Sequence, residues 1–207
     1  MSVRVQEWIL SGALLFPLVV IVTSLAASWL SERPVSEFTR DLAAVAGVPP
    51  WLGLLSQVGN ILWWASASIA ALGAMQLADS RRIDARHFLW LFAGLTLLLA
   101  ADDTFMVHER LAPRFLGLHE LVLVSLYGAL LAYMLIRYRT TVWQQTGRAL
   151  LGLALAGFVL SVAIDTLPED LLPLHHLFED GSKLVGISCW LGFSVQSVLY
   201  HTALDRR

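Results

Sequence analysis

Long apolar runs alternate with short polar connections along the chain. A helix that crosses a bilayer needs about 20 predominantly apolar residues. Six runs reach this length, at approximately residues 8–30, 51–77, 88–108, 118–137, 148–167 and 176–200. The pattern therefore predicts an all-α, polytopic membrane protein in which six transmembrane helices form a single bundle domain over residues 1–207. We expect the first run to remain as a helix, because it is longer than the apolar core of a signal peptide.

The connection between the first two runs has a pattern of its own, PVSEFTRDLAAVAGVPP at residues 34–50. Ser36 is a candidate helix N-cap, and Gly47 is a candidate helix end. Apolar residues recur between them at helical spacing. This pattern predicts one short helix that lies on the outer interface of the membrane.

Composition supports the membrane assignment. Hydrophobic residues make up 57% of the chain and charged residues 14%, and the mean hydropathy is +0.67. These values exclude an ordinary soluble domain. The single cysteine, Cys189, excludes an internal disulfide. We expect membrane lipids around the protein and no nucleic-acid partner, while the sequence leaves the oligomeric state open.

Arginine placement predicts the orientation of the six helices. Cytoplasmic connections carry an excess of basic residues. One side of the six-helix arrangement holds Arg4, Arg81, Arg82, Arg86, Arg137, Arg139, Arg148, Arg206 and Arg207. The other side holds Arg33, Arg40, Arg110 and Arg114. Both termini are therefore predicted to be cytoplasmic, in an inner or plasma membrane, and most of the acidic residues then fall on the outer half.

Charged residues interrupt two of the apolar runs at the same predicted depth. Asp102 and Asp103 precede the outer end of the third run by about two turns, which is roughly 10 Å at 1.5 Å per residue. Lys183, the only lysine of the chain, lies at about that depth in the sixth run. A continuous helix would place Asp102 and Glu109 on one face. Intramembrane charges need a partner or a function, so these groups are expected to meet.

Two interpretations of Lys183 remain open. As a charge partner, it would neutralise Glu179, four residues earlier, or one of the aspartates on the third run. As a catalytic group, a desolvated lysine would act as a general base or form a Schiff base. We take Asp103 and Lys183 as the candidate catalytic residues.

Histidines and carboxylates near the start of the sixth run are candidate metal ligands. His175 and His176 precede Glu179 by four and three residues, so one helix face can present them together. With Asp102 from the third run, these groups could hold zinc, iron or manganese. The alternative is a hydrogen-bonded and ion-paired network without a metal. Further candidates for this polar site are His108, Glu109, His119, Glu120, Asp165 and Asp180.

Two fragments resemble the membrane hydrolases of the alkaline ceramidase and adiponectin-receptor group. DDTFM at residues 102–106 is similar to that group's Asp-acidic-x-x-Met signature, and HHLFE at 175–179 is similar to its last-helix His-x-x-x-His zinc motif. The resemblance implies that His175 and Glu179 bind the metal and that Asp102 lies beside it. In that group, a third histidine and a serine one turn before it lie shortly before the aspartate. The nearest counterparts in this chain are Trp64 for the histidine and Asn60 for the serine, and both lie far before Asp102.

These observations favour a metal-dependent intramembrane enzyme, and most of all a hydrolase of a lipid-like amide or ester. The metal would activate water, and Asp103 or Lys183 would transfer protons. Three alternatives remain: a proton- or ion-coupled transporter, a di-metal membrane oxidoreductase, and a non-catalytic subunit of a membrane complex.

Overall fold

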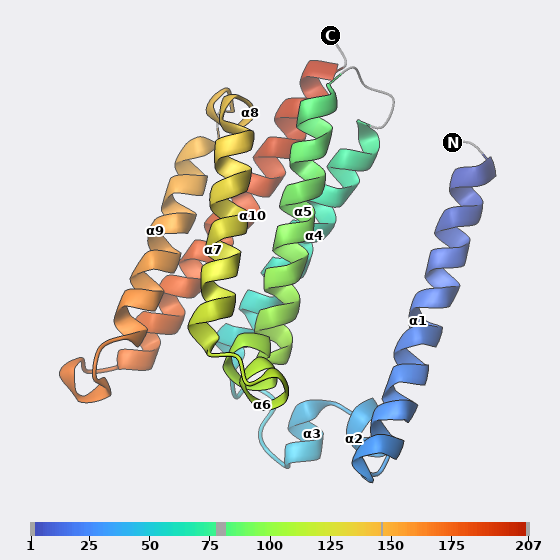
Figure 1. The fold of residues 1–207 in the computed structure, drawn as a ribbon, viewed down its shortest axis with the longest axis vertical. Helices are drawn as coiled ribbons and strands as arrows, with labels where there is room; N and C mark the ends of the chain where they lie inside the picture. The colour runs from blue at the N-terminus through green and yellow to red at the C-terminus, as the bar shows by residue number, and fades with distance from the viewer. Residues whose placement is uncertain (1–2, 78–81, 146, 206–207) are drawn as a thin grey trace. The chain divides into compact units, whose positions relative to one another are not determined.

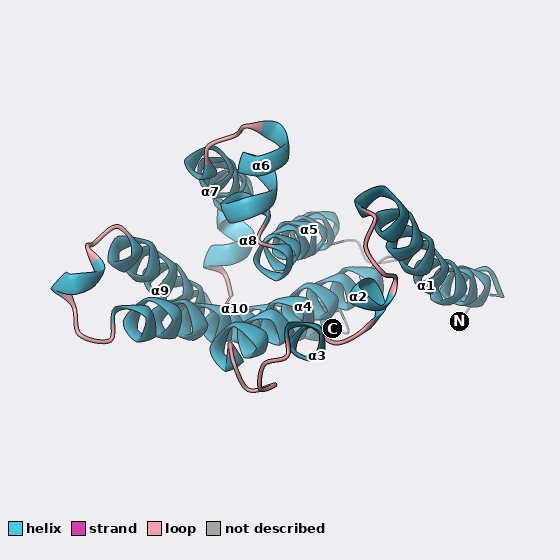
Figure 2. Ribbon diagram, turned by 90° about the horizontal axis from the view of Figure 1, so that it is seen from below, coloured by secondary structure: helices cyan, strands magenta, loops and turns pink. Residues whose placement is uncertain are grey.

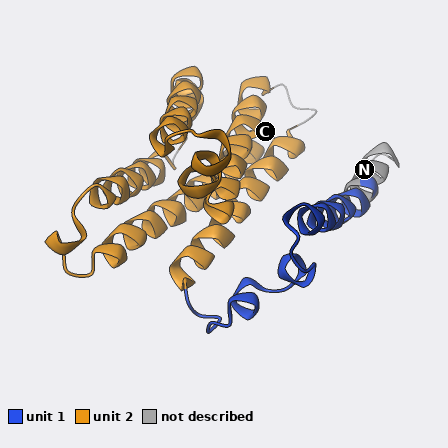
Figure 3. Cartoon of the chain, turned by 60° about the horizontal axis from the view of Figure 1, so that its bottom comes forward, with its two compact units in different colours: residues 1–52 blue, residues 53–207 orange. Residues whose placement is uncertain are grey.

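The structure is a computed structural model that describes residues 3–77, 82–145 and 147–205. Every regular element among these residues is a helix. Six of the helices are long and apolar enough to cross a membrane, which confirms the predicted all-α class and the six spans. Contacts divide the chain into two compact units, residues 1–52 and 53–207 (Figure 3), and the single domain stays a prediction.

Unit 1 contains the first candidate span and the interfacial segment. Helix α1 (Val3–Ser31) is followed by two short helices, α2 (Ser36–Thr39) and α3 (Leu42–Ala46). The predicted single interfacial helix is therefore wrong. Ser36 is the first residue of α2 and not its cap, while the Asp41 carboxylate accepts hydrogen bonds from the N–H groups of Ala43 and Ala44. A capping aspartate starts a new helix, and this splits the segment.

Unit 2 contains the other five candidate spans. They are α4 (Leu54–Gln76), α5 (Ile83–Phe105), α7 (Glu120–Arg137), α9 (Arg148–Asp165) and α10 (His175–Asp205). Short elements lie in the connections: a π-helical turn η1 (Val107–Leu111), α6 (Ala112–Leu116), α8 (Arg139–Trp143) and a 3₁₀ turn η2 (Glu169–Leu171). Helix α10 packs along both α9 and α4, and α4 packs along α5 (Figures 1 and 2).

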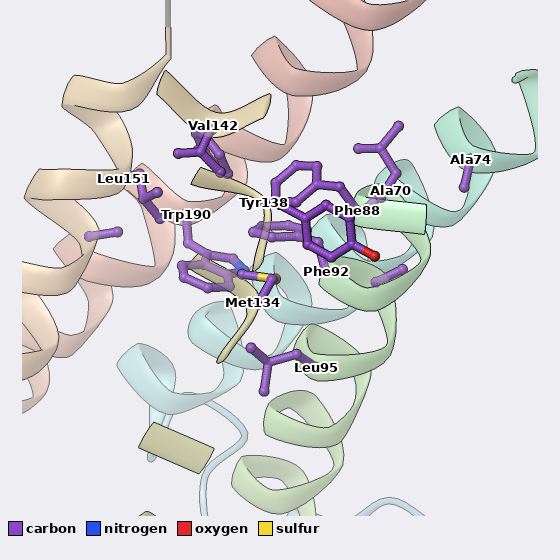
Figure 4. Packing of buried hydrophobic residues seen from close by; sticks show 14 of the residues in the cluster. Ala70, Ala74, Phe88, Phe92, Leu95, Met134, Tyr138, Val142, Leu151 and Trp190 are labelled. Carbon is purple, nitrogen blue, oxygen red and sulfur yellow. The ribbon is translucent and has the colours of Figure 1, made fainter. Parts of the chain in front are cut away.

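Aromatic side chains from α4, α5 and α10 build the core of unit 2. Phe92 on α5 stacks on Trp190 on α10 with ring centroids 4.7 Å apart, and both are fully buried (Figure 4). The Trp190 indole donates a hydrogen bond of 2.9 Å to the Thr96 hydroxyl. Trp63 on α4 joins the same cluster. This packing fixes the relative positions of α4, α5 and α10, and α5 and α10 carry Asp102, Asp103 and Lys183.

Helix α5 ends earlier than the hydrophobic pattern indicates. The third span was expected to reach residue 108, but α5 ends at Phe105 because Met106 adopts a left-handed conformation with φ of +50°. The π-helical turn η1 follows. The prediction that Asp102 and Glu109 share one continuous helix face is therefore wrong, since the helix axis is interrupted between them.

Candidate functional site

Polar side chains gather at the end of unit 2 where α5 and α9 finish and where α4, α7 and α10 begin (Figure 1). We call it the outer end, after the orientation that the arginines predict. Three clusters lie there: Asp102 with His108 and Tyr127, Asp103 with Lys183, and His175 with His176 and Glu179. Tyr127 and Lys183 are distant in sequence from the aspartates that they contact, and a change of helix direction separates His108 from Asp102. The third cluster lies within one helix.

The Asp102 carboxylate is buried and fully engaged. One oxygen, Oδ1, accepts hydrogen bonds of 2.9 Å from the His108 backbone N–H and from the Tyr127 hydroxyl. The other oxygen, Oδ2, pairs with Nδ1 of the His108 ring. The left-handed turn at Met106 returns the chain toward α5, and this places His108 over the last turn of the helix.

His108 is held in a charged environment. The hydrogen bond with Asp102 raises the pKa of His108 above its usual value, against the opposing effects of burial and of the Lys183 charge. Glu109 acts in the same direction as Asp102, with Oε1 3.7 Å from Nε2 of His108. Protonated His108 therefore forms an ion pair with Asp102, and this cation lies just beyond the end of helix α5.

Asp103 and Lys183 form a second ion pair, which joins α5 to α10. The Lys183 Nζ donates to Oδ1 of Asp103, and the aspartate side chain is only 12% exposed. Both residues line a small cavity of about 20 Å³ together with Asp180 and Ser56. A cavity of this size has room for about one water molecule. The cation of Lys183 thus pairs with the third span and not with Glu179 on its own helix.

His175, His176 and Glu179 meet in the first turns of α10. Oε2 of Glu179 lies 3.9 Å from Nδ1 of His175 and 3.6 Å from Nδ1 of His176. One ligand atom from each residue falls within 4.8 Å of the others. Leu174, the residue before the helix, has a left-handed φ of +61°, which is costly for leucine. This strained residue lies immediately before α10 and the two histidines.

The tautomer of His175 follows from its surroundings. The residue is 6% exposed, and Nε2 of its ring lies 2.9 Å from the Ile164 carbonyl on α9. Because a carbonyl only accepts hydrogen bonds, Nε2 carries a proton, and in the neutral ring Nδ1 then keeps its lone pair. Nδ1 is buried and has no hydrogen-bond partner. A histidine that donates its other N–H to a carbonyl is the usual arrangement of a metal ligand.

The structure does not bring the other candidates into this group. Asp102 is engaged by His108 and Tyr127 and lies outside it. His119 instead caps α7 by accepting a hydrogen bond of 3.3 Å from the N–H of Leu121. The remaining candidates lie at helix ends or in the connections: Glu109 in η1, Glu120 at the start of α7 and Asp165 at the end of α9.

Two partners in these clusters were not among the candidate residues. Tyr127 lies about two helical turns after Glu120, and its depth in the fourth apolar run could have marked it as a hydrogen-bond donor to Asp102. The Ile164 carbonyl had no sequence signal, because every residue carries a carbonyl. Only the packing of α9 against α10 selects this one.

These features define the class of the protein, a multi-pass helical membrane protein with an ion-paired polar end. The family described as "Domain of unknown function (DUF8692)" matches residues 12–197, and the chain belongs to that family. No curated protein and no solved structure matches the chain.

Proposed function

We propose that the protein is a metal-dependent membrane hydrolase that acts on a lipid-like amide or ester. Its metal, a divalent zinc, iron or manganese ion, is held by His175, His176 and Glu179. One observation carries this proposal: the buried Nδ1 of His175 has a lone pair, no hydrogen-bond partner and a carboxylate oxygen 3.9 Å away. A buried polar atom without a partner is costly unless a ligand satisfies it.

The separations within the group suit a shared ion. The distances of 3.6 and 3.9 Å from Oε2 of Glu179 to the two imidazoles are too long for hydrogen bonds. Ligands bound at about 2.0–2.2 Å around one tetrahedral ion are about 3.3–3.6 Å apart. The 3.6 Å distance to His176 already fits, and a small movement of the Glu179 side chain would shorten the 3.9 Å distance to His175. Two imidazoles and one carboxylate leave a fourth position open for water, as catalytic zinc sites require.

Residues near the three ligands supply the groups for proton transfer. A bound divalent ion lowers the pKa of its water and polarises a carbonyl. Lys183 follows Glu179 by about one helical turn, and its ion pair with Asp103 lies beside a cavity with room for water. We assign proton transfer to this pair. Asp102 takes no part as a ligand, since His108 and Tyr127 occupy its oxygens.

The surface around the ligand group favours an apolar substrate. Leu174, Leu177 and Phe178 flank the histidines, and each has more than half of its surface exposed. At the predicted outer membrane level, this surface faces lipid chains. A substrate with an acyl chain could therefore lie along the start of α10, with its amide or ester carbonyl beside the histidines.

Metal analysis of the protein purified in detergent tests the proposal. We expect about one zinc, iron or manganese ion per chain in the wild type. The variants His175→Asn and Glu179→Gln should lose at least about 90% of this metal, because removing one of three ligands costs several kcal/mol of binding free energy. The loaded wild type should release fatty acid from long-chain amides or esters.

The matched control is His119→Asn, which changes another outer-end histidine that caps α7 and lies outside the ligand group. This variant should keep its metal. A folded wild type that stays metal-free after incubation with all three ions would overturn the proposal. Equal metal loss in the control would also contradict it, since binding would then not depend on the assigned ligands.

A further inference from the structure

The connection between α5 and α7 carries an amphipathic surface that the proposed hydrolase does not use. Helix α5 has 23 residues, so it is about 35 Å long and can cross a hydrocarbon core of about 30 Å. The end of α5 and the start of α7 therefore both lie near the headgroup level. The helical segment between them, η1 with α6 at residues 107–116, lies at that level too. Figure 2 shows α6 beside α7 and apart from α9.

One helical path runs through η1 and α6, and it aligns two arginines. Leu111 and Ala112, at the junction, both have right-handed helical backbone angles. Arg110 and Arg114 are four residues apart across this junction, so their side chains lie on one face about one turn apart. Both arginines are exposed, whereas Ala112 is buried. The arginine pair therefore lies on the uncovered side of the η1–α6 segment.

Neither guanidinium of this pair forms an ion pair with a residue that the structure describes. The carboxylate next to Arg110 in the sequence, Glu109, is directed to the His108 ring, with Oε1 3.7 Å from Nε2. The Arg114 guanidinium lies over the Phe115 ring, 5.8 Å from its centroid. Basic residues are biased away from the outer side of a membrane protein. Two arginines one turn apart at this acidic end therefore indicate an anion from outside the chain.

Large apolar side chains flank the arginine pair and are uncovered in unit 2. Four of them are at least 40% exposed: Phe105, Leu111, Phe115 and Leu116. At the headgroup level, such side chains contact acyl chains, while the long side chain of arginine reaches the polar groups. Cations and apolar side chains next to each other match both parts of a phospholipid. A soluble anion would contact only the cations.

We infer that the η1–α6 segment binds an anionic phospholipid of the adjacent leaflet. The guanidiniums of Arg110 and Arg114 donate hydrogen bonds to its phosphate oxygens, which suit the fork of an arginine. Leu111 and Phe115 contact its acyl chains. Charge complementarity favours a headgroup with net negative charge over a zwitterionic one, because two cations lie together without a protein carboxylate to balance them. The inference uses none of the three candidate metal ligands, so it does not rest on the proposed hydrolysis.

Thermal unfolding of the full-length protein in detergent tests this inference. The probes are dialkyl ether forms of phosphatidylglycerol and phosphatidylcholine, because an ether lipid offers no ester or amide to the proposed hydrolase. The phosphatidylglycerol form should raise the unfolding temperature of the wild type by several degrees more than the phosphatidylcholine form does, since a ligand that binds only the folded state stabilises it. The double variant Arg110→Gln with Arg114→Gln should weaken the binding of the phosphatidylglycerol form by about tenfold or more.

The matched control is the double variant Arg33→Gln with Arg40→Gln. It removes the same charge from unit 1, where Arg33 already pairs with Glu37 at 2.9 Å, and should bind as the wild type does.

Two further measurements make the result specific. Phe115→Ser leaves both cations in place and should still weaken the binding of the phosphatidylglycerol form, because it removes an apolar contact. Glycerol phosphate, which has no acyl chains, should not reproduce the shift. Equal shifts from the two lipids, no shift from either, the full shift from glycerol phosphate, or an equal loss in the control variant would each overturn the inference.

Discussion

At the residue scale, consecutive aspartates on α5 have different partners. Asp102 pairs with His108 and Tyr127 on the side of η1 and α7, while Asp103 pairs with Lys183 on α10. Successive residues of a helix point about 100° apart, so they cannot face the same neighbour. The pair of carboxylates therefore ties the third span to three different elements. Each partner removes part of the cost of a charge near the membrane interior.

Lys183→Met should destabilise the protein by about 1–3 kcal/mol. The loss is smaller than the roughly 3–5 kcal/mol of a fully buried pair, because 35% of the lysine side chain is exposed. The double variant Lys183→Met with Asp103→Asn should recover most of the loss, since no unpaired charge remains. Chemical unfolding in detergent measures both. Arg114→Met, on α6, removes an outer-end cation outside this pair and should change stability by less than about 0.5 kcal/mol.

If Lys183→Met proves as stable as the wild type, charge balance does not explain the lysine. Activity of the metal-loaded variant then becomes the deciding measurement. Retained stability with lost activity would assign Lys183 to proton transfer alone.

His108 should make stability depend on pH. Its pKa is raised in the folded state, so the folded protein binds the proton more tightly than the unfolded chain. The resulting stabilisation is fully present below the unfolded pKa of about 6.5 and is lost as pH rises through the folded pKa. The stability difference between the wild type and His108→Gln should therefore be larger at about pH 6 than at about pH 9.

The Asp102→Asn background provides the control for this pH dependence, because the main cause of the raised pKa is then absent. In that background, adding the His108→Gln substitution should change stability by a nearly constant amount across the same pH range. A constant difference in the wild-type background would show that Asp102 and His108 do not form a charged pair.

At the element scale, glycines set how closely α9 and α10 approach. A Cβ added at Gly157 of α9 would lie 2.9 Å from the backbone of Gly186 on α10, which no rotamer change can relieve. Small residues at such crossings let helix backbones pack closely in membranes. The same approach allows the Ile164 carbonyl, further along α9, to reach His175. Helix packing therefore positions the candidate metal ligand.

Gly157→Ala should destabilise the protein by about 1–3 kcal/mol, because the two helices must separate to admit the methyl group. It should also lower metal content, since the Ile164–His175 hydrogen bond depends on this packing. Gly152→Ala on the same helix meets nothing within 4 Å and should be neutral or slightly stabilising. Equal unfolding midpoints for the two variants would contradict the assigned role of Gly157.

At the scale of the whole molecule, the five candidate spans of unit 2 divide its charges between two ends. The opposite end carries the basic connections, whereas the outer end carries the acidic clusters and the candidate ligand group. The orientation itself rests on the arginine distribution.

Cysteine labelling tests this orientation. In a Cys189→Ala background, Glu169→Cys in the loop before α10 should react with a membrane-impermeant maleimide on intact cells. Gln144→Cys, after α8, should react only after permeabilisation. Both positions are exposed, so accessibility within the protein does not distinguish them. The reverse labelling pattern would invert the orientation, and labelling of both on intact cells would contradict the odd number of spans between them.

The sequence alone determined the class of the protein and the positions of its spans. Apolar runs of about 20 residues are sufficient evidence, since the bilayer imposes both length and polarity on a crossing helix. The proximity of the three candidate ligands could also be predicted from the sequence, because the spacing of His175, His176 and Glu179 within one helix fixes their separation. Equal depth made the aspartates of the third span candidate partners of Lys183, but the sequence could not choose between Asp102, Asp103 and Glu179.

Only the tertiary structure decided the remaining partners. The left-handed turn at Met106 brings His108 back to Asp102, and local sequence gives no glycine or asparagine to predict such a turn. The crossing of α9 and α10 selects the Ile164 carbonyl, and the fold of unit 2 brings the start of α5 to His201. The physical reason is that hydrophobic patterning specifies which helices form and how far they extend. Their relative rotation and contacts depend on side-chain packing between distant segments.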